Sequence, residues 1–193
     1  MRSLCVFCGS SPGVRPEYAA AARRLGTSLA RRGIRLVYGG ARVGLMGELA
    51  NATLHANGAV TGVIPDGLLA REVAHTHLTD LRIVSTMHDR KALMADLADG
   101  FLAIPGGAGT LEEFFEVWTW AQLGIHRKPC GLLNVHGYFD GLLTFLDHAV
   151  AERFLRTEHR AMVLVGDDPE QLLERFEAYR APAVAKWIDS SET

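Results

Sequence analysis

Apolar residues recur along the chain in two patterns, as short continuous runs and as longer segments with apolar positions every three or four residues. The short runs are bounded by Gly, Pro, Asp or Ser and predict strands. These strands are Leu4–Cys8, Arg35–Tyr38, Val60–Ile64, Arg82–Val84, Phe101–Ile104, Cys130–Asn134 and Met162–Val165. The longer segments predict amphipathic helices. They are Pro16–Arg32, Gly44–Asn57, Met87–Ala98, Thr110–Leu123, Tyr138–Glu152 and Glu170–Tyr179.

The order of these elements predicts the fold class. Strands and helices alternate, and parallel strands require crossovers that place helices against the sheet. We therefore expect an α/β fold that is Rossmann-like and doubly wound, with a mostly parallel sheet and helices on both faces. A length of 193 residues fits one domain. We expect that domain over residues 1–180, a partly disordered tail over 181–193, and a loop or short helix in the weakly patterned segment Gly67–Thr79.

Composition and charge exclude several classes of protein. A formal net charge of −2 provides no positive field for a nucleic-acid backbone, so we expect no nucleic-acid partner. No apolar run approaches the length of a membrane span or of a signal-peptide core, so we expect no membrane association. The 3 cysteines are too few and odd in number for a disulfide framework. We therefore expect a cytoplasmic location.

Glycine clusters follow several of the predicted strands. They are Gly9-Ser10-Ser11, Gly39-Gly40, Pro65-Asp66-Gly67 and Pro105-Gly106-Gly107-Ala108-Gly109-Thr110. Ligands of open α/β sheets bind outside the carboxyl ends of the strands, where glycine allows close approach and helix N-termini attract anions. One such cluster alone is often just a turn, but several at one edge predict a phosphate-bearing ligand of nucleotide size. The Walker and Gly-x-Gly-x-x-Gly patterns are missing, which argues against phosphoryl transfer and dinucleotide redox chemistry.

Charged residues open two of the predicted helices. Thr110-Leu111-Glu112-Glu113 fits a capping box between Thr110 and Glu113, and the alternative is a functional carboxylate beside an anion site. Met87-His88-Asp89-Arg90-Lys91 places cations at a helix N-terminus, where the helix dipole disfavours them. We expect an anion to compensate them, either a phosphate or Glu113, unless they form a solvated charge run.

The cysteines, histidines and tryptophans favour packing roles. Cys5 and Cys8 are spaced as in a redox CxxC motif, but on a strand they point to opposite faces, so both are expected to pack. His75-Thr76-His77 lacks a complete set of metal ligands, so these histidines are expected at the surface and no metal is expected. Trp118 and Trp120 are expected in the core or at a subunit contact.

The stretch Pro105-Gly106-Gly107-Ala108-Gly109-Thr110-Leu111-Glu112-Glu113 resembles the PGGxGTxxE signature of the Lonely Guy family. Members of that family are cytokinin riboside 5′-monophosphate phosphoribohydrolases, and their relatives have often been labelled lysine decarboxylases. Further segments resemble the family in the same order. They are Val6-Phe7-Cys8-Gly9-Ser10-Ser11, Tyr38-Gly39-Gly40, Val43-Gly44-Leu45-Met46-Gly47, Met87-His88-Asp89-Arg90-Lys91 and Thr119-Trp120-Ala121-Gln122-Leu123-Gly124.

The resemblance implies hydrolysis of the N-glycosidic bond of cytokinin riboside 5′-monophosphates or AMP, releasing an adenine-type base and ribose 5-phosphate. It implies that Arg90 and Glu113 are the catalytic pair. It also implies substrate contacts by Glu72, Lys91, Gly106, Gly107, Ala108, Gly109, Thr110, Leu111, Glu112 and Thr119. Glycosidic cleavage passes through an oxocarbenium-like transition state, so a carboxylate at Glu113 suits charge stabilisation and water orientation. The permanently charged Arg90 suits positioning or stabilisation of the departing base.

Partners and specificity follow from the same resemblance. It implies a homodimer that acts on a small nucleoside 5′-monophosphate, and no cofactor is expected. Ala108 stands where many relatives carry tyrosine or another larger residue, and Ala41-Arg42 replaces a frequent Gly-Ser. Both departures bear on substrate preference more than on the type of reaction.

Two other functions compete with nucleotide hydrolysis. A lysine decarboxylase needs a lysine for a pyridoxal Schiff base, and the chain offers only Lys91, Lys128 and Lys186. A single domain of this length also leaves little room for the usual pyridoxal folds. The alternative from another class is a non-catalytic nucleotide or molybdenum-cofactor carrier, against which the retention of Arg90 and Glu113 argues.

Overall fold

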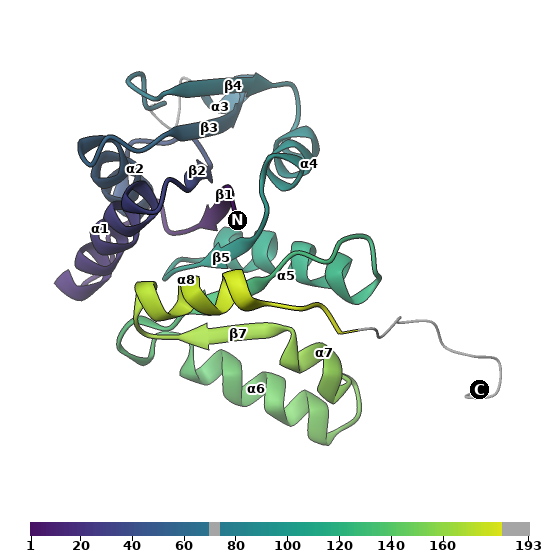
Figure 1. Cartoon of the computed structure of the whole chain (residues 1–193). Helices are drawn as coiled ribbons and strands as arrows, with labels where there is room; N and C mark the ends of the chain where they lie inside the picture. The colour runs from purple at the N-terminus through teal and green to yellow at the C-terminus, as the bar shows by residue number, and fades with distance from the viewer. Residues whose placement is uncertain (70–73, 183–193) are drawn as a thin grey trace.

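The computed structural model of the chain describes residues 1–69 and 74–182 and contains one seven-stranded sheet (Figure 1). Its strand order is β4-β3-β2-β1-β5-β6-β7, and every neighbouring pair is parallel. In the centre, Cys5 of β1 pairs with Val37 of β2 and with Phe101 of β5. The strands are β1 Ser3–Phe7, β2 Arg35–Tyr38, β3 Val60–Pro65, β4 Asp80–Val84, β5 Phe101–Ala103, β6 Cys130–Leu133 and β7 Val163–Gly166.

Helices cover both faces of this sheet, which confirms the predicted doubly wound α/β fold. Apolar residues of α1, α2 and α8 pack on one face, and those of α4, α5 and α6 pack on the other. The helices are α1 Pro16–Arg31, α2 Gly44–His55, α3 Asp66–Leu69, α4 Met87–Leu97, α5 Ala108–Gln122, η1 Val135–Gly137, α6 Asp140–Ala151, α7 Thr157–Ala161 and α8 Pro169–Ala178. Within the described ranges, no helix is both long enough and apolar enough to cross a membrane.

The first strand shows why the sheet needs two cores. Leu4 and Val6 face the core beneath α1 and α2, whereas Cys5 and Phe7 face the core beneath α4 and α5. Such continuous burial on both faces is typical of parallel sheets. Cys5 and Cys8 lie in different cores as free thiols, and burial raises the pKa of both, so the packing role predicted for them is confirmed.

The predicted helices and strands exist, but some boundaries and short elements differ. The helix predicted from Thr110 begins at Ala108, and the helix predicted from Tyr138 begins at Asp140, after the separate turn η1. The short helix α3 lies mostly in the segment Gly67–Thr79, where a loop or short helix was expected, whereas α7 was not predicted, because five residues are too few to show helical periodicity. The predicted disorder of the tail concerns residues that, from 183 onward, lie outside the described part of the chain.

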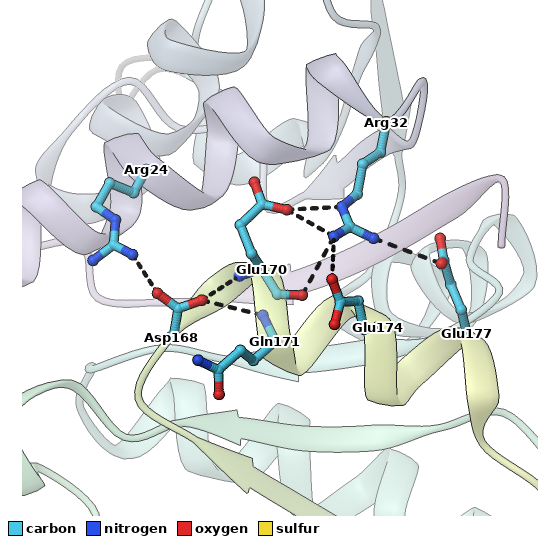
Figure 2. A network of polar contacts seen from close by, with 7 residues as sticks. All are labelled: Arg24, Arg32, Asp168, Glu170, Gln171, Glu174 and Glu177. Atoms are coloured by element: carbon cyan, nitrogen blue, oxygen red, sulfur yellow. Dashed lines mark hydrogen bonds and ion pairs between the residues drawn. The ribbon is translucent and has the colours of Figure 1, made fainter.

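A polar network joins the first and last helices across one face of the sheet (Figure 2). Arg32, the C-cap residue of α1, forms ion pairs with Glu170, Glu174 and Glu177, which follow one another along one side of α8. The Asp168 carboxylate caps α8 by accepting hydrogen bonds from the backbone N–H groups of residues 170 and 171, and Arg24 pairs with it at 2.5 Å. The bond from the N–H of residue 171 is the main reason that the pKa of Asp168 is lowered. This network holds α8 against α1 on the side of the sheet that carries α2.

Candidate active site

The strand order reverses between β1 and β5, and the loops that follow these two strands meet. The N–H of Gly9 donates to the carbonyl of Pro105 at 3.1 Å, and the N–H of Leu45 donates to the carbonyl of Gly9 at 3.0 Å. Such a switch point is where open α/β sheets bind ligands. A cavity of about 350 Å³ lies here, and its lining includes residues of the glycine clusters after β1, β2 and β5. The fourth cluster, Pro65-Asp66-Gly67, is not part of its lining.

The glycine-rich loop after β5 leads directly into α5. Gly107 is the N-cap, and its carbonyl accepts the first helical hydrogen bond, from Leu111 at 3.2 Å. The N–H groups of the first turn therefore have no partner within the helix, and the positive end of the helix dipole faces the cavity wall formed by Gly107–Thr110. A Cβ on Gly106 would overlap the Thr110 hydroxyl and come within 2.8 Å of the Gly9 nitrogen, so this close contact requires glycine.

This geometry overturns the capping box predicted at Thr110 and Glu113. Thr110 lies inside the first turn of α5, where it is 4% exposed, and the N-cap is three residues earlier. The prediction failed because the helix begins two residues before the point at which the apolar periodicity starts. The Glu113 side chain is therefore free to pair across to α4.

A capping box that was not predicted from the sequence is present at the start of α4 instead. The Thr86 hydroxyl accepts a hydrogen bond from the Asp89 N–H at 3.0 Å, and the Thr86 N–H donates to the Asp89 carboxylate at 3.1 Å. The Thr-x-x-Asp spacing was a usable signal in the sequence. The box fixes the first turn of α4, which carries Arg90.

Arg90 and Glu113 form an ion pair at the cavity. Arg90 Nη1 lies 2.7 Å from Glu113 Oε1, and the two side chains are only 11% and 13% exposed. The Arg90 Nε–H also donates to the Val63 carbonyl at 3.1 Å, which holds the guanidinium at the end of β3. Burial raises the pKa of the Glu113 carboxyl above its ordinary value, and the attraction of Arg90 only partly offsets this. The cavity thus contains a desolvated carboxylate whose charge is balanced by one fixed cation.

Two further ion pairs connect the same two helices. Lys91 Nζ lies 2.5 Å from Glu112 Oε1 and 3.1 Å from Glu116 Oε2. The hydrogen bond to Glu112 is the main reason that the pKa of Lys91 is raised. Carboxylates of α5 therefore compensate the cations at the start of α4. Glu113 compensates Arg90, and it is one of the two anions that the sequence led us to expect.

The structure brings only part of the predicted site together. Arg90, Glu113 and the segment Gly107–Thr110 line the cavity, and Gly106 lines an adjoining one. Lys91, Leu111, Glu112 and Thr119 are not among the lining residues, and Glu72 lies outside the described residues. Ser10 and Gly39 also line the cavity, as expected of the glycine clusters that contain them, and the lining residues Met46 and Met87 were given no role at the site from the sequence.

Gly39 has a structural role at the site, because its lack of a side chain leaves room for the Arg90 guanidinium. A Cβ at this position would overlap Arg90 Nη2 and lie 3.3 Å from the Met46 sulfur. We expect Gly39→Ala to displace the guanidinium from Glu113 and to lower kcat by up to about 10²-fold, the cost of a misplacement of about 1 Å at a reacting centre. Steady-state assays of the nucleotide hydrolysis that the sequence resemblance implies would measure this. Gly67→Ala is the matched control, since a Cβ at Gly67 meets nothing within 4 Å. Equal activity of both variants would contradict the role given to Gly39.

The remaining candidate residues have structural roles, and the predicted position of His75 is corrected. His75 is 6% exposed and its Nε2 lies 2.9 Å from Asn51 Oδ1, so the predicted surface position is wrong for this histidine. A bridge between Ala41 and Ala74 folds this segment onto the loop after β2, a contact that local sequence does not reveal. Trp118 is 2% exposed, which confirms its predicted place in the core. Over residues 1–69 and 74–182, no group of three His, Cys, Asp or Glu side chains is arranged to hold a metal ion.

Comparisons with known proteins agree with the resemblance found in the sequence. The family described as "possible lysine decarboxylase" matches residues 46–176. A cytokinin riboside 5′-monophosphate phosphoribohydrolase of Rhodococcoides fascians is 53% identical over 170 residues, which cover 88% of this chain and 86% of the relative. An enzyme of the same name from Arabidopsis thaliana is 51% identical over 178 residues, which cover 92% of this chain and 82% of the relative.

Solved structures with low sequence identity share the fold. The molybdenum cofactor carrier protein of Chlamydomonas reinhardtii superposes with a TM-score of 0.71 at 19% identity, covering 92% of this chain and 99% of that protein. The molybdenum cofactor binding protein of Rippkaea orientalis gives a TM-score of 0.70 at 21% identity, covering 92% and 97%. At such identities the likeness concerns the fold only.

Proposed function

Because this chain belongs to the family of the cytokinin riboside 5′-monophosphate phosphoribohydrolases, we propose that it hydrolyses cytokinin riboside 5′-monophosphates or AMP. Water adds to C1′ of the ribose, the N-glycosidic bond breaks, and the base leaves with a proton. The products are a free adenine-type base and ribose 5-phosphate. The observation that supports this best is the buried Arg90–Glu113 pair, which shares its cavity with the glycine-rich start of α5.

In this proposal the substrate phosphate binds at the N-terminus of α5. Gly107, Ala108, Gly109 and Thr110 present backbone N–H groups that have no helical partner, and the helix dipole favours an anion there. Ala108 adds only a methyl group to this wall. The phosphate therefore anchors the nucleotide with its ribose toward Arg90 and Glu113.

Glu113 stabilises positive charge that develops on the ribose and orients the attacking water. A carboxylate suits both tasks because the transition state of glycosidic cleavage resembles an oxocarbenium ion. Burial strengthens the interaction, since few water molecules screen a carboxylate that is 13% exposed. Arg90 favours the ionised form of Glu113 and fixes its position, and the Nη2 group of Arg90 contacts the leaving base or the ribose in this proposal.

The other residues assigned by resemblance act around this centre. Lys91 and Glu112, together with Glu116, tie α4 to α5 and so help to set the distance between their chain neighbours Arg90 and Glu113. Leu111 and Thr119 belong to the same helix α5. Substrate contacts by Glu72, Lys91, Glu112 and Thr119 stay part of the proposal.

The name "possible lysine decarboxylase" is not the activity we propose. A Schiff base requires a neutral amine, whereas Lys91 is held in ion pairs that raise its pKa. Lys128 donates to the Ala95 carbonyl at 2.8 Å and lies away from the lining of the cavity, and Lys186 is outside the described residues. The carrier alternative has support from the fold only.

We further propose that the enzyme is a homodimer in the cytoplasm and that it needs neither metal nor cofactor. Large apolar side chains are exposed on or beside the site helices, including Met87 at 42%, Leu123 at 45% and Ile125 at 66%. Exposed apolar side chains mark a subunit contact where they form one contiguous patch, which is the arrangement we propose for these residues. Free, buried cysteines are consistent with a reducing compartment.

The test of this function compares AMP with adenosine. Purified protein should release adenine from AMP with a kcat/KM at least about 10²-fold above that for adenosine, since two charge-assisted hydrogen bonds to phosphate contribute about 1.5 kcal/mol each. Chromatography of the free base measures this, with isopentenyladenosine monophosphate as a second substrate and a chelator-treated sample alongside. Equal values for AMP and adenosine, carbon dioxide release from lysine, or loss of activity after chelation would each contradict a part of the proposal.

A further inference from the structure

Tyr138, which ends the turn η1, makes a specific contact with the glycine-rich loop after β5. Its hydroxyl donates a hydrogen bond to the Gly106 carbonyl at 2.6 Å, although the two residues are 32 positions apart. Tyr138 and Gly107 also border a second cavity of about 280 Å³, next to the one that contains Arg90. Gly107 borders both cavities, so the contact reaches the loop where the two cavities adjoin.

The turn that carries Tyr138 is held in one conformation. His136 has φ 54° and ψ 35°, and Gly137 has φ 70°, so two successive residues are left-handed. Asn134 fixes the turn by donating to the Asp140 carboxylate at 2.7 Å and by accepting the Phe139 N–H at 2.7 Å. A non-glycine residue in this region of backbone space needs such support, and supported outliers cluster at functional sites.

The hydrogen bond to Gly106 controls where the next N–H group points. The carbonyl of Gly106 and the N–H of Gly107 belong to one planar trans peptide, so they point in opposite directions. Between two glycines this peptide has few intrinsic restraints on its rotation. In the described parts of the chain, the N–H of Gly107 has no hydrogen-bond acceptor. Holding the carbonyl toward Tyr138 therefore leaves this N–H directed away from Tyr138 and available to a ligand.

We propose that Tyr138 is a positioning residue for the substrate phosphate, which it serves by locking the Gly106–Gly107 peptide so that the Gly107 N–H meets the phosphate. This inference rests on the proposed function, because the phosphate belongs to the nucleotide substrate. Tyr138 does not touch the reacting atoms. The phosphate contact that Tyr138 positions stabilises the bound substrate and the transition state equally. Its loss therefore raises KM and leaves kcat nearly unchanged.

Tyr138→Phe isolates the hydroxyl, because it keeps the ring and its edge contact with Tyr18 at 5.6 Å. We expect the Kd of ribose 5-phosphate, measured by calorimetry, and the KM for AMP to rise about 3- to 10-fold, the usual effect of one lost hydrogen bond. The kcat for AMP and the kcat/KM for adenosine should stay within about 2-fold, since neither depends on a phosphate contact. Tyr18→Phe is the matched control, because it removes a hydroxyl from the same ring pair without a bond to the loop.

Each outcome of this experiment has one meaning. If the unmodified protein releases no adenine from AMP, the proposed function fails, whatever the variants do. If it releases adenine and Tyr138→Phe binds ribose 5-phosphate normally, the positioning role is overturned. A drop of equal size for AMP and adenosine would also overturn it, since that pattern indicates a general structural defect. Tyr138 is 42% exposed, so the variant is expected to fold with an unchanged Tm.

Discussion

Glu113→Gln is expected to lower kcat for AMP hydrolysis by about 10²- to 10⁴-fold, the range typical for loss of a catalytic carboxylate. The amide has nearly the same shape and still accepts a hydrogen bond from Arg90, which now lies 2.7 Å from Glu113. It carries no negative charge, so it cannot stabilise an oxocarbenium-like transition state. Steady-state and single-turnover rates of adenine release measure the effect.

The same variant should not lose stability. The pKa of Glu113 is raised in the folded protein, so above that pKa the ionised carboxylate destabilises the fold relative to an ordinary exposed glutamate. Gln removes this burial cost, but it also leaves the largely buried Arg90 guanidinium without its counter-charge, so the two effects oppose each other and we expect little change in Tm at neutral pH. Turnover close to that of the unmodified protein, in a variant that still binds AMP, would favour the carrier function.

Arg90→Ala is expected to reduce both turnover and stability. Its guanidinium is the main charge that lowers the pKa of Glu113, so its removal raises that pKa further. In the unmodified enzyme kcat/KM should fall as the pH drops through a Glu113 pKa above the ordinary glutamate value, and in Arg90→Ala this acidic limb should move to higher pH. Breaking a largely buried ion pair should also cost about 3 kcal/mol of unfolding free energy at neutral pH.

The pH dependence of that stability loss has a definite sign. A carboxyl with a raised folded pKa reduces stability as the pH rises from its unfolded pKa through its folded pKa. The loss of unfolding free energy caused by Arg90→Ala should therefore become smaller in acid, where Glu113 is protonated. Thermal or urea unfolding at several pH values would measure this. Arg82→Ala is the control, because Arg82 is 58% exposed and pairs only with Asp80 in the described chain. It should change stability within about 0.5 kcal/mol. Similar losses for both variants would show that Arg90 is an ordinary surface arginine.

The alternation of apolar runs and amphipathic segments determined the doubly wound fold from the sequence by itself. This was possible because burial on two faces imposes continuous apolar strands such as Leu4–Cys8, and crossover helices each need one apolar side. The glycine clusters likewise identified the ligand-binding edge, since strand ends of a parallel sheet meet at one side. The motif that opens at Pro105 identified the family.

Only the tertiary structure decided how the charged residues pair. Glu113 fits a local capping box as well as a contact with Arg90, and local spacing cannot choose between a near and a distant partner. The choice depended on where α5 begins and on how closely α4 lies beside it. The tertiary structure likewise decided the hydrogen bond from Tyr138 to Gly106 and the burial of His75. Each joins segments far apart in the chain, and the free energy of such contacts depends on packing that no short stretch of sequence specifies.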